Sequence, residues 1–168
     1  MLDVSAALKN PGSVYPLNAE LSFEPCTVMG EELTFSDATL SGEFFSADEV
    51  VSVRADLTVT VHAHCARCLE PVTETLKTRV EAEFSRTGDG EEMYPITGHT
   101  VELKEPAFEG LLIGLPMRFL CREDCKGLCP VCYRNRNLGL CTCLEGVVKP
   151  NPFAALKDFH CEPNNEEV

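Results

Sequence analysis

The chain has 168 residues, of which 44% are hydrophobic and 24% are charged. This length and composition predict one folded domain with a real core and exclude a chain that is disordered throughout. Fourteen Lys and Arg against 27 Asp and Glu give a net charge of −13, which argues against broad binding to nucleic acid or to an anionic membrane surface. Ten cysteines, about 6% of the chain, are fewer than a disulfide scaffold usually carries.

The N-terminal residues do not have the pattern of a secretory signal. Asp3 is acidic, the apolar stretch after it is short, and Lys9 follows that stretch instead of preceding it. No apolar run approaches the length that spans a bilayer. We therefore expect a cytoplasmic protein without membrane contact, and in that reducing compartment clustered cysteines indicate metal ligation rather than disulfides.

The strongest periodic pattern lies in the middle of the chain. Odd-numbered residues from Val51 to Ala63 are apolar and their even-numbered neighbours are polar, and residues 72–84 repeat the alternation in the other phase. Between these segments stands the turn Cys65-Ala-Arg-Cys-Leu-Glu-Pro71. The pattern predicts a long antiparallel hairpin with Cys65 and Cys68 at its tip.

Weaker patterns predict the remaining elements. Shorter strands are expected over residues 21–26, 33–35, 39–45 and 94–103, which makes an antiparallel sheet of four to six strands, and residues 85–92 are expected to form a polar loop. Apolar residues at helical spacing predict a helix over 106–115, although Gly110 and Gly114 lower its propensity. A second short helix is expected over 152–160.

Together these elements predict an α+β fold that is mostly antiparallel sheet. We expect a single domain over residues 1–168, with a β-rich core over 19–104. Residues 105–161 then supply a helix, a cysteine-rich zinc-knuckle segment and the C-terminal helix, and residues 162–168 form a disordered tail.

Eight of the ten cysteines form close pairs, and a close pair can direct two thiolates at one tetrahedral metal ion. The pairs are Cys65/Cys68, Cys121/Cys125, Cys129/Cys132 and Cys141/Cys143. Four pairs suffice for two zinc sites of four thiolates each. The last two pairs are local in sequence and predict one compact knuckle, so the first two would form the other site, which is one of three ways to combine the pairs.

The charge pattern supports this interpretation. Residues 121–143 are the one locally basic stretch, at +2, with Arg122, Lys126, Arg134 and Arg136 against Glu123 and Asp124. Nearby cations favour the charged form of a thiol. Compensation of the thiolates explains Arg134 and Arg136 as well as a specific RNA contact does, and both interpretations stay open.

Other interpretations of the cysteines and histidines are weaker. Cys129-Pro-Val-Cys132 resembles the motif of a thiol oxidoreductase, but no predicted strand leads into it and the polar residues 134–137 make a poor start for a redox helix. Cys26 and Cys161 stand alone and are expected to be ordinary residues. His62 and His64 share the polar face of the hairpin, where solvation is favoured over ligation.

Motifs of enzymatic chemistry are absent from the sequence. It contains no Gly-rich phosphate loop, no nucleophile elbow and no His-Glu-x-x-His. A zinc ion held by four cysteines has no open position for water. We therefore expect a protein that is not an enzyme, has no small-molecule substrate and holds structural zinc.

Three segments together resemble the YceD family of bacterial and plastid large ribosomal RNA subunit accumulation proteins. They are the turn Cys65–Pro71, the run Leu-Pro-Met-Arg-Phe-Leu-Cys-Arg-Glu-Asp-Cys-Lys-Gly-Leu-Cys-Pro-Val-Cys over 115–132, and Lys-Pro-Asn-Pro-Phe-Ala-Ala-Leu-Lys over 149–157. The resemblance spans about residues 20–160. It implies a non-enzymatic role in the synthesis, processing or stability of the large-subunit ribosomal RNA. The acidity of the chain then suits contact with a basic ribosomal protein or a pre-large-subunit particle.

The chain departs from the family pattern at one position. Members of the family often carry glycine directly after the second cysteine of Cys-Pro-x-Cys, for which a positive φ is easy, and here the residue is Tyr133. This puts the ideal knuckle turn in question. The competing interpretation of the whole chain is a zinc-stapled protein-interaction module unrelated to ribosomes, which would co-purify with non-ribosomal partners.

Overall fold

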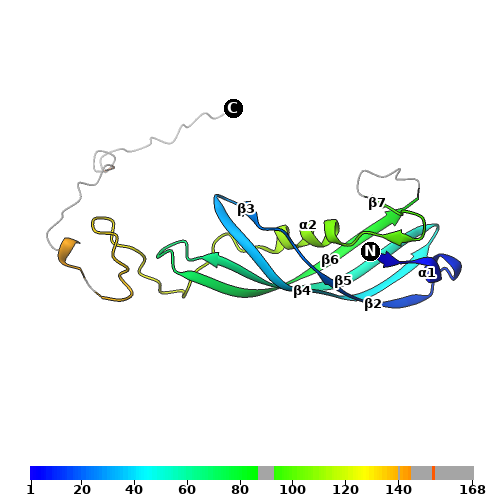
Figure 1. Ribbon diagram of the computed structural model, residues 1–168, viewed down its shortest axis with the longest axis horizontal. Helices are drawn as coiled ribbons and strands as arrows, with labels where there is room; N and C mark the ends of the chain where they lie inside the picture. Colours follow the sequence, from blue (N-terminus) through cyan, green and yellow to red (C-terminus); the bar gives the residue numbers. More distant parts are fainter. Residues whose placement is uncertain (87–92, 140, 145–152, 154–168) are drawn as a thin grey trace, which may run out of the picture. The chain divides into compact units, whose positions relative to one another are not determined.

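A computed structural model describes residues 1–86, 93–139, 141–144 and 153. The chain divides into two compact units, Met1–Cys125 and Lys126–Val168 (Figure 1). The large hydrophobic core, from Val4 to Phe119, belongs wholly to the first unit. The predicted helix and the pair Cys121/Cys125 are therefore part of the first unit, while the single domain expected over residues 1–168 stays a prediction.

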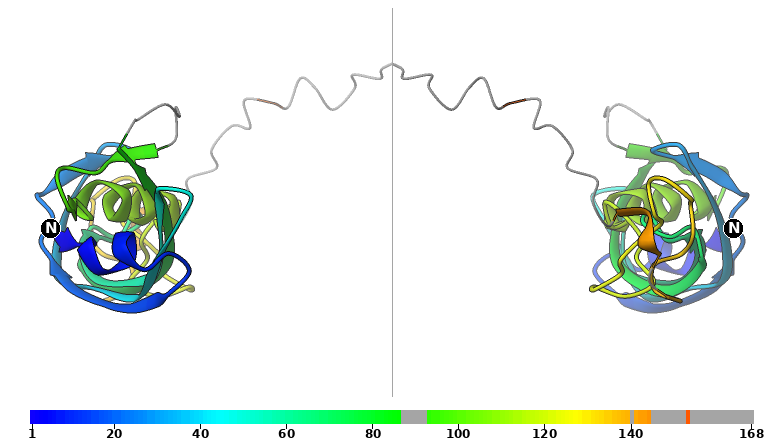
Figure 2. Two further views of the ribbon diagram at one scale, coloured as in Figure 1. Left: turned by 90° about the vertical axis from the view of Figure 1, so that its right-hand side faces the viewer. Right: turned by 90° about the vertical axis from the view of Figure 1, so that its left-hand side faces the viewer.

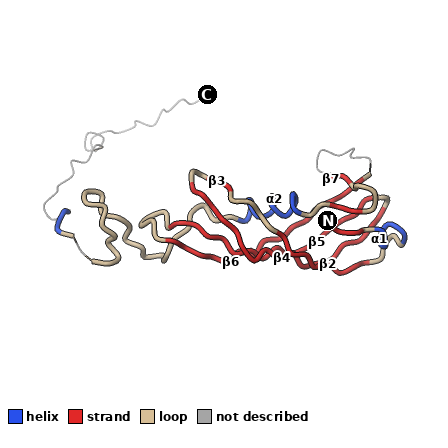
Figure 3. The backbone as a smooth tube through the Cα atoms, viewed as in Figure 1, coloured by secondary structure: helices blue, strands red, loops and turns tan. Residues whose placement is uncertain are grey.

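The first unit is dominated by antiparallel sheet, so the predicted α+β class is confirmed (Figure 3). Its strands are β1 (Leu2–Asp3), β2 (Val14–Leu21), β3 (Cys26–Val28), β4 (Glu31–Ala47), β5 (Val50–His64), β6 (Pro71–Ser85), β7 (Met93–Pro95) and β8 (Thr100–Val101), and its helices are α1 (Ser5–Lys9) and α2 (Lys104–Gly114). The main sheet has the order β2-β4-β5-β6-β7, with β3 paired to β4. Every pair in it is antiparallel except β6–β7, and β1 pairs with β8 in a separate ribbon.

The long hairpin forms as predicted. Strands β5 and β6 pair continuously from Val51 opposite Phe84 to His64 opposite Pro71. The odd-numbered residues of β5 from Val51 to Ala63 are all buried, whereas their even-numbered neighbours are half-buried or exposed. This alternation fixes the pairing register, because a slip by one residue would turn the apolar row to solvent.

Several shorter strands differ from the prediction. The strand expected over residues 21–26 is wrong, because Leu21 ends β2 and Cys26 begins β3 with no strand between them. The strands expected over 33–35 and 39–45 are one strand, β4, with a register shift between Ser36 and Thr39. Asp37 has a positive φ of 50° there, so the polar residues that suggested a turn form a bulge. The strand expected over 94–103 is divided into β7 and β8.

Helix α2 begins two residues before the predicted start and lies inside the curved sheet (Figure 2). A Cβ atom at Gly110 would lie 3.0 Å from Val80 Cγ2, and one at Gly114 would lie 2.9 Å from the Thr78 side chain. The Thr78 hydroxyl also donates a hydrogen bond to the Gly110 carbonyl at 3.2 Å. The two glycines that lower helix propensity are therefore what lets the helix lie close to β6.

Some predicted segments lie outside the described residues. They are the helix over 152–160 apart from Phe153, the tail over 162–168, and residues 87–92 of the polar loop. In the part of the chain that is described, no helix is both long and apolar enough to cross a membrane.

Candidate metal centres

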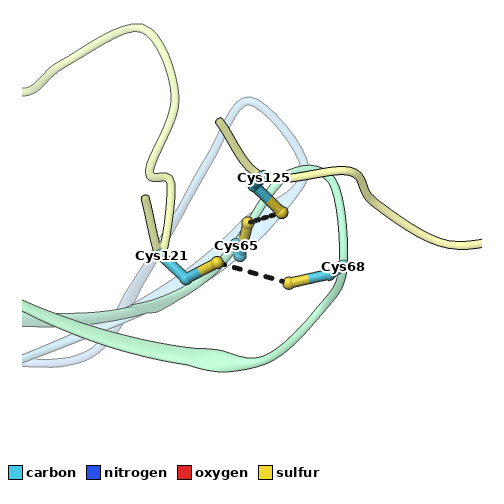
Figure 4. Close-up of side chains that lie close together, drawn as sticks. All are labelled: Cys65, Cys68, Cys121 and Cys125. Atoms are coloured by element: carbon cyan, nitrogen blue, oxygen red, sulfur yellow. Dashed lines mark hydrogen bonds between the residues drawn. The ribbon is translucent and has the colours of Figure 1, made fainter. Parts of the chain in front are cut away.

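The tip of the β5–β6 hairpin is a tight knuckle held by two backbone hydrogen bonds. The Cys65 amide donates to the Glu70 carbonyl at 2.8 Å, and the Leu69 amide donates to the Cys65 carbonyl at 2.9 Å. Leu69 has a left-handed backbone, with φ of 61°. The turn brings the Cys65 and Cys68 side chains to one side of the hairpin tip, and both are buried (Figure 4).

The segment that follows α2 is tied to this knuckle. The Ala66 amide donates to the Phe119 carbonyl at 2.9 Å. The Arg67 guanidinium donates through Nη1 to the carbonyls of Glu123, at 3.1 Å, and Cys125, at 2.9 Å. Sequence reasoning did not single out Arg67, and no spacing rule could have done so, because its two acceptors are backbone atoms that only the fold places there.

These contacts bring four cysteines into one group, Cys65, Cys68, Cys121 and Cys125, whose sulfurs all lie within 4.8 Å of one another. The Sγ atoms of Cys65 and Cys125 are 3.8 Å apart, and those of Cys68 and Cys121 are 3.6 Å apart (Figure 4). A tetrahedral zinc ion with Zn–S bonds near 2.3 Å separates its sulfurs by roughly 3.8 Å. A disulfide instead requires about 2.05 Å, and each of these four cysteines is a free thiol.

The second unit repeats the same knuckle. The Cys129 amide donates to the Arg134 carbonyl at 2.8 Å, and the Tyr133 amide donates to the Cys129 carbonyl at 2.9 Å. Tyr133 has a φ of 57°. The tyrosine thus adopts the left-handed conformation for which glycine is usual, and the turn forms without glycine.

The second knuckle is joined by Cys141 and by Cys143, which lies in the 3₁₀ turn Thr142–Leu144. Its four sulfurs, from Cys129, Cys132, Cys141 and Cys143, also lie within 4.8 Å of one another. Of the three ways to combine the four cysteine pairs, this structure has the one that keeps the last two pairs together. Each group could hold a metal ion.

One thiol in each group ionises easily. Burial alone would raise the pKa of Cys65, but hydrogen bonds from the backbone amides of Cys121, Arg67 and Cys68 outweigh it and lower that pKa to about 6. In the second group the amides of Cys132 and Val131 lower the pKa of Cys129 to about 6.

The thiols of Cys121 and Cys143 resist ionisation. Desolvation and the sulfurs of Cys125 and Cys68 raise the pKa of Cys121 to about 12. Hydrogen bonding to Cys132, followed by desolvation, raises the pKa of Cys143 to about 11. Four thiolates this close repel one another unless a cation lies among them, so the donor set and its spacing fit a soft divalent metal ion.

Among the described residues, the other cysteine and histidine candidates from the sequence are not part of the two cysteine groups. Burial raises the pKa of Cys26 in β3, and this thiol belongs to neither group. The His62 ring hydrogen-bonds to the hydroxyls of Ser36, at 2.9 Å, and Thr73, at 3.1 Å, so it links neighbouring strands of the sheet. Cys161 lies outside the described residues.

Comparison with known proteins places the chain in a family. Uncharacterized proteins of Mycobacterium bovis and of two Mycobacterium tuberculosis strains are each 25% identical to it over 141 residues, which is 78% of this chain and 68% of the relative. No solved structure gives a significant match. The family model described as "Large ribosomal RNA subunit accumulation protein YceD" matches residues 53–160, more than half of the chain and a range that includes all eight clustered cysteines. The resemblance seen in the sequence is thereby confirmed, and the chain belongs to the YceD family.

Proposed function

We propose that this protein is a non-enzymatic factor that supports the synthesis, processing or stability of the large-subunit ribosomal RNA. The observation that carries the proposal is the family match over residues 53–160, because the family is described by the accumulation of that RNA. The chain's own chemistry is compatible with it, since both candidate metal sites consist of four protein ligands and leave no open position for a reacting water.

The proposal includes structural zinc in both groups of cysteines. Cys65, Cys68, Cys121 and Cys125 would hold one ion, and Cys129, Cys132, Cys141 and Cys143 the other. Thiolate ligands in tetrahedral array favour zinc. The first ion would fasten the hairpin tip to the segment after α2, where Arg67 already joins the two through backbone carbonyls.

The proposed partners follow from charge. A net charge of −13 attracts a basic ribosomal protein or a pre-large-subunit particle in the cytoplasm, and it disfavours a membrane surface. Arg134 and Arg136, in the locally basic segment, are the residues proposed to meet RNA directly.

Depletion of the protein from its own cells tests this function. We expect the large-subunit ribosomal RNA to fall relative to the small-subunit RNA, and the free large subunit to fall in gradient profiles. Re-expression of the wild-type chain should restore both. Unchanged RNA ratios and normal subunit profiles would refute the proposal and would favour an interaction module unrelated to ribosomes.

A pull-down from lysate separates the same alternatives by partner. RNA sequencing and mass spectrometry on one eluate should recover large-subunit RNA or ribosomal proteins. Recovery of non-ribosomal proteins alone contradicts the proposed role.

A further inference from the structure

The two knuckles share a backbone but present different side chains. In both, the first cysteine donates to the carbonyl five residues on and accepts from the amide four residues on. At the first knuckle Arg67 makes contacts within the first unit, because its guanidinium donates to the carbonyls of Glu123 and Cys125. The second knuckle carries Tyr133 and Arg134 at the positions where the first has Leu69 and Glu70.

Tyr133 is an exposed aromatic ring in a conformation that favours glycine. Its φ is 57° and 73% of the residue is accessible to solvent. Within the described residues it takes part in none of the ring-stacking or cation–π contacts. Leu69 has the same backbone conformation, so the turn does not require a ring at this position, and the ring is available to a ligand.

The sequence segment that carries this ring has only positive charges. Residues 126–139 contain Lys126, Arg134 and Arg136 and no acidic residue. Among described residues the ion pairs are Arg79–Glu81 and Arg122–Asp124, so neither Arg134 nor Arg136 has an ion-pair partner there. Within the part of the chain that is described, Arg134 and Arg136 thus stand next to an exposed aromatic residue in the sequence and form no ion pair.

An aromatic face beside unpaired arginines suits single-stranded RNA. Unstacked bases stack on tyrosine, and arginine meets the phosphates between them. A duplex closes its base faces and presents dense phosphate, which a chain of net charge −13 repels. Val131 and Leu138 of the same segment are exposed as well.

We propose that the second knuckle binds single-stranded RNA, with a base stacked on Tyr133 and the adjoining phosphates bound by Arg134 and Arg136. The proposal rests on the proposed function and names the region of the chain that would touch RNA. The first knuckle is then an internal fastening, and only the second is a recognition surface.

Binding of the full metal-loaded chain to a labelled single-stranded RNA of about ten nucleotides, measured by fluorescence anisotropy, tests this inference. We expect a Kd on the order of 10 µM at low salt. Tyr133→Gly removes the ring and relieves the backbone, so it should fold and weaken binding about tenfold. Tyr133→Phe keeps the ring and should bind within about twofold of the wild type. Leu69→Gly is the matched control at the first knuckle and should leave the affinity unchanged.

The arginines are tested by salt and by metal content. Each arginine removed by Arg134→Ala or Arg136→Ala should lower the slope of log affinity against log salt by about 0.7. A role limited to neutralising the thiolates predicts instead a lower metal affinity with unchanged RNA binding, and that result would overturn the inference.

Failure of this inference is distinguishable from failure of the proposed function. Equal binding by Tyr133→Gly and the wild type, absence of saturable binding, or preference for duplex RNA of the same length would each overturn the RNA surface. The depletion phenotype does not depend on those measurements. A lost large subunit in depleted cells together with no RNA binding would point to a protein partner.

Discussion

At the scale of single residues, each candidate metal site combines a thiol whose pKa is lowered with thiols whose pKa is raised. The difference comes from backbone amides, which the knuckle turn directs at Cys65 and Cys129. Cys121 and Cys143 have neighbouring sulfurs instead, and their pKa values are raised. A metal ion that enters the first site therefore meets the Cys65 thiolate at neutral pH and must displace protons from the thiols whose pKa is raised.

The metal-free protein should show this asymmetry in a pH titration. The first unit keeps its core without metal, and there the pKa of Cys65 is lowered from 9.0 to about 6, so thiolates of Cys65 should persist as the pH falls from 9 and disappear near 6. Unfolding in denaturant at neutral pH should abolish them, because the unfolded thiols return to a pKa near 9. Thiolate ultraviolet absorbance measures both. Cys65→Ser should remove this signal and Cys129→Ser should leave it in place, and a first ionisation only above pH 9 would contradict the expectation.

Substitution of single cysteines should change the metal content stepwise. We expect two zinc equivalents for the wild type and one for either Cys65→Ser or Cys129→Ser, because a site with three thiolates binds the ion far more weakly. Elemental analysis after dialysis measures the ratio. Cys26→Ser is the matched control, since this half-buried thiol lies outside both groups, and a loss of zinc in that variant would contradict the assignment of ligands.

Tyr133 has a backbone conformation that is unusual for tyrosine. The resemblance to the YceD family implies glycine after the second cysteine of the knuckle, where a positive φ is easy, and this chain has tyrosine there. The structure has both the conformation and the tyrosine. Hydrogen bonds on either side, from Tyr133 to Cys129 and from Cys129 to Arg134, hold the turn against that cost.

At the scale of elements, the sheet depends on close approach between strands as well as on hydrophobic alternation. Gly42 of β4 pairs with Ala55 of β5. A Cβ atom at Gly42 would lie 2.5 Å from the Ala55 Cα and closer still to the Arg54 carbonyl oxygen. No side chain fits there without moving one strand from the other.

Gly42→Ala should therefore destabilise the first unit. We expect a loss of at least about 2 kcal/mol in the free energy of unfolding, since the clash is with backbone atoms that cannot rotate away. Urea denaturation with the metal content held constant measures it. Gly139→Ala is the control, because a Cβ there meets nothing within 4 Å. A midpoint for Gly42→Ala equal to that of the control would refute the close approach.

The elements differ in how well the sequence predicts them. The β5–β6 hairpin is predictable because its signal is a local alternation over many residues. The sequence pattern predicts two strands in place of β4, because the bulge at Ser36 and Asp37 resembles a turn. Only pairing with β5 on both sides of the bulge makes the strand continuous. Gly110 and Gly114 lower the helix propensity of α2 in the sequence. Their role depends on how close Val80 and Thr78 of β6 lie to the helix, which the local sequence does not encode.

At the scale of the whole molecule, the two units are stabilised differently. The first has its own hydrophobic core, which includes every residue of the buried cluster. In the described part of the second unit, Cys129 and Gly127 are the buried residues, and backbone hydrogen bonds with one group of four thiols supply the order. A segment without a core of its own needs a metal ion to fold.

Chelation should consequently unfold one unit and spare the other. After removal of metal at neutral pH under reducing conditions, amide hydrogen exchange in residues 126–139 should become fast, while β5 and the C-terminal half of β6, where the buried residues of that strand lie, stay protected. Exchange measured by mass spectrometry on peptic fragments reports both at once. Restored protection on adding zinc back is the control, and protection of residues 126–139 that survives chelation would contradict the dependence on metal.

The amino-acid sequence by itself determined the Cys-tipped hairpin, the four close cysteine pairs and the family, because each signal is contained in residues that are neighbours in the chain. Tertiary structure alone decided that Cys65 lies beside Cys125, 60 residues away, that Arg67 joins those segments through backbone carbonyls, and that Tyr133 adopts a left-handed backbone with its side chain exposed. These contacts are made between distant segments, and their energies depend on packing that no local pattern encodes.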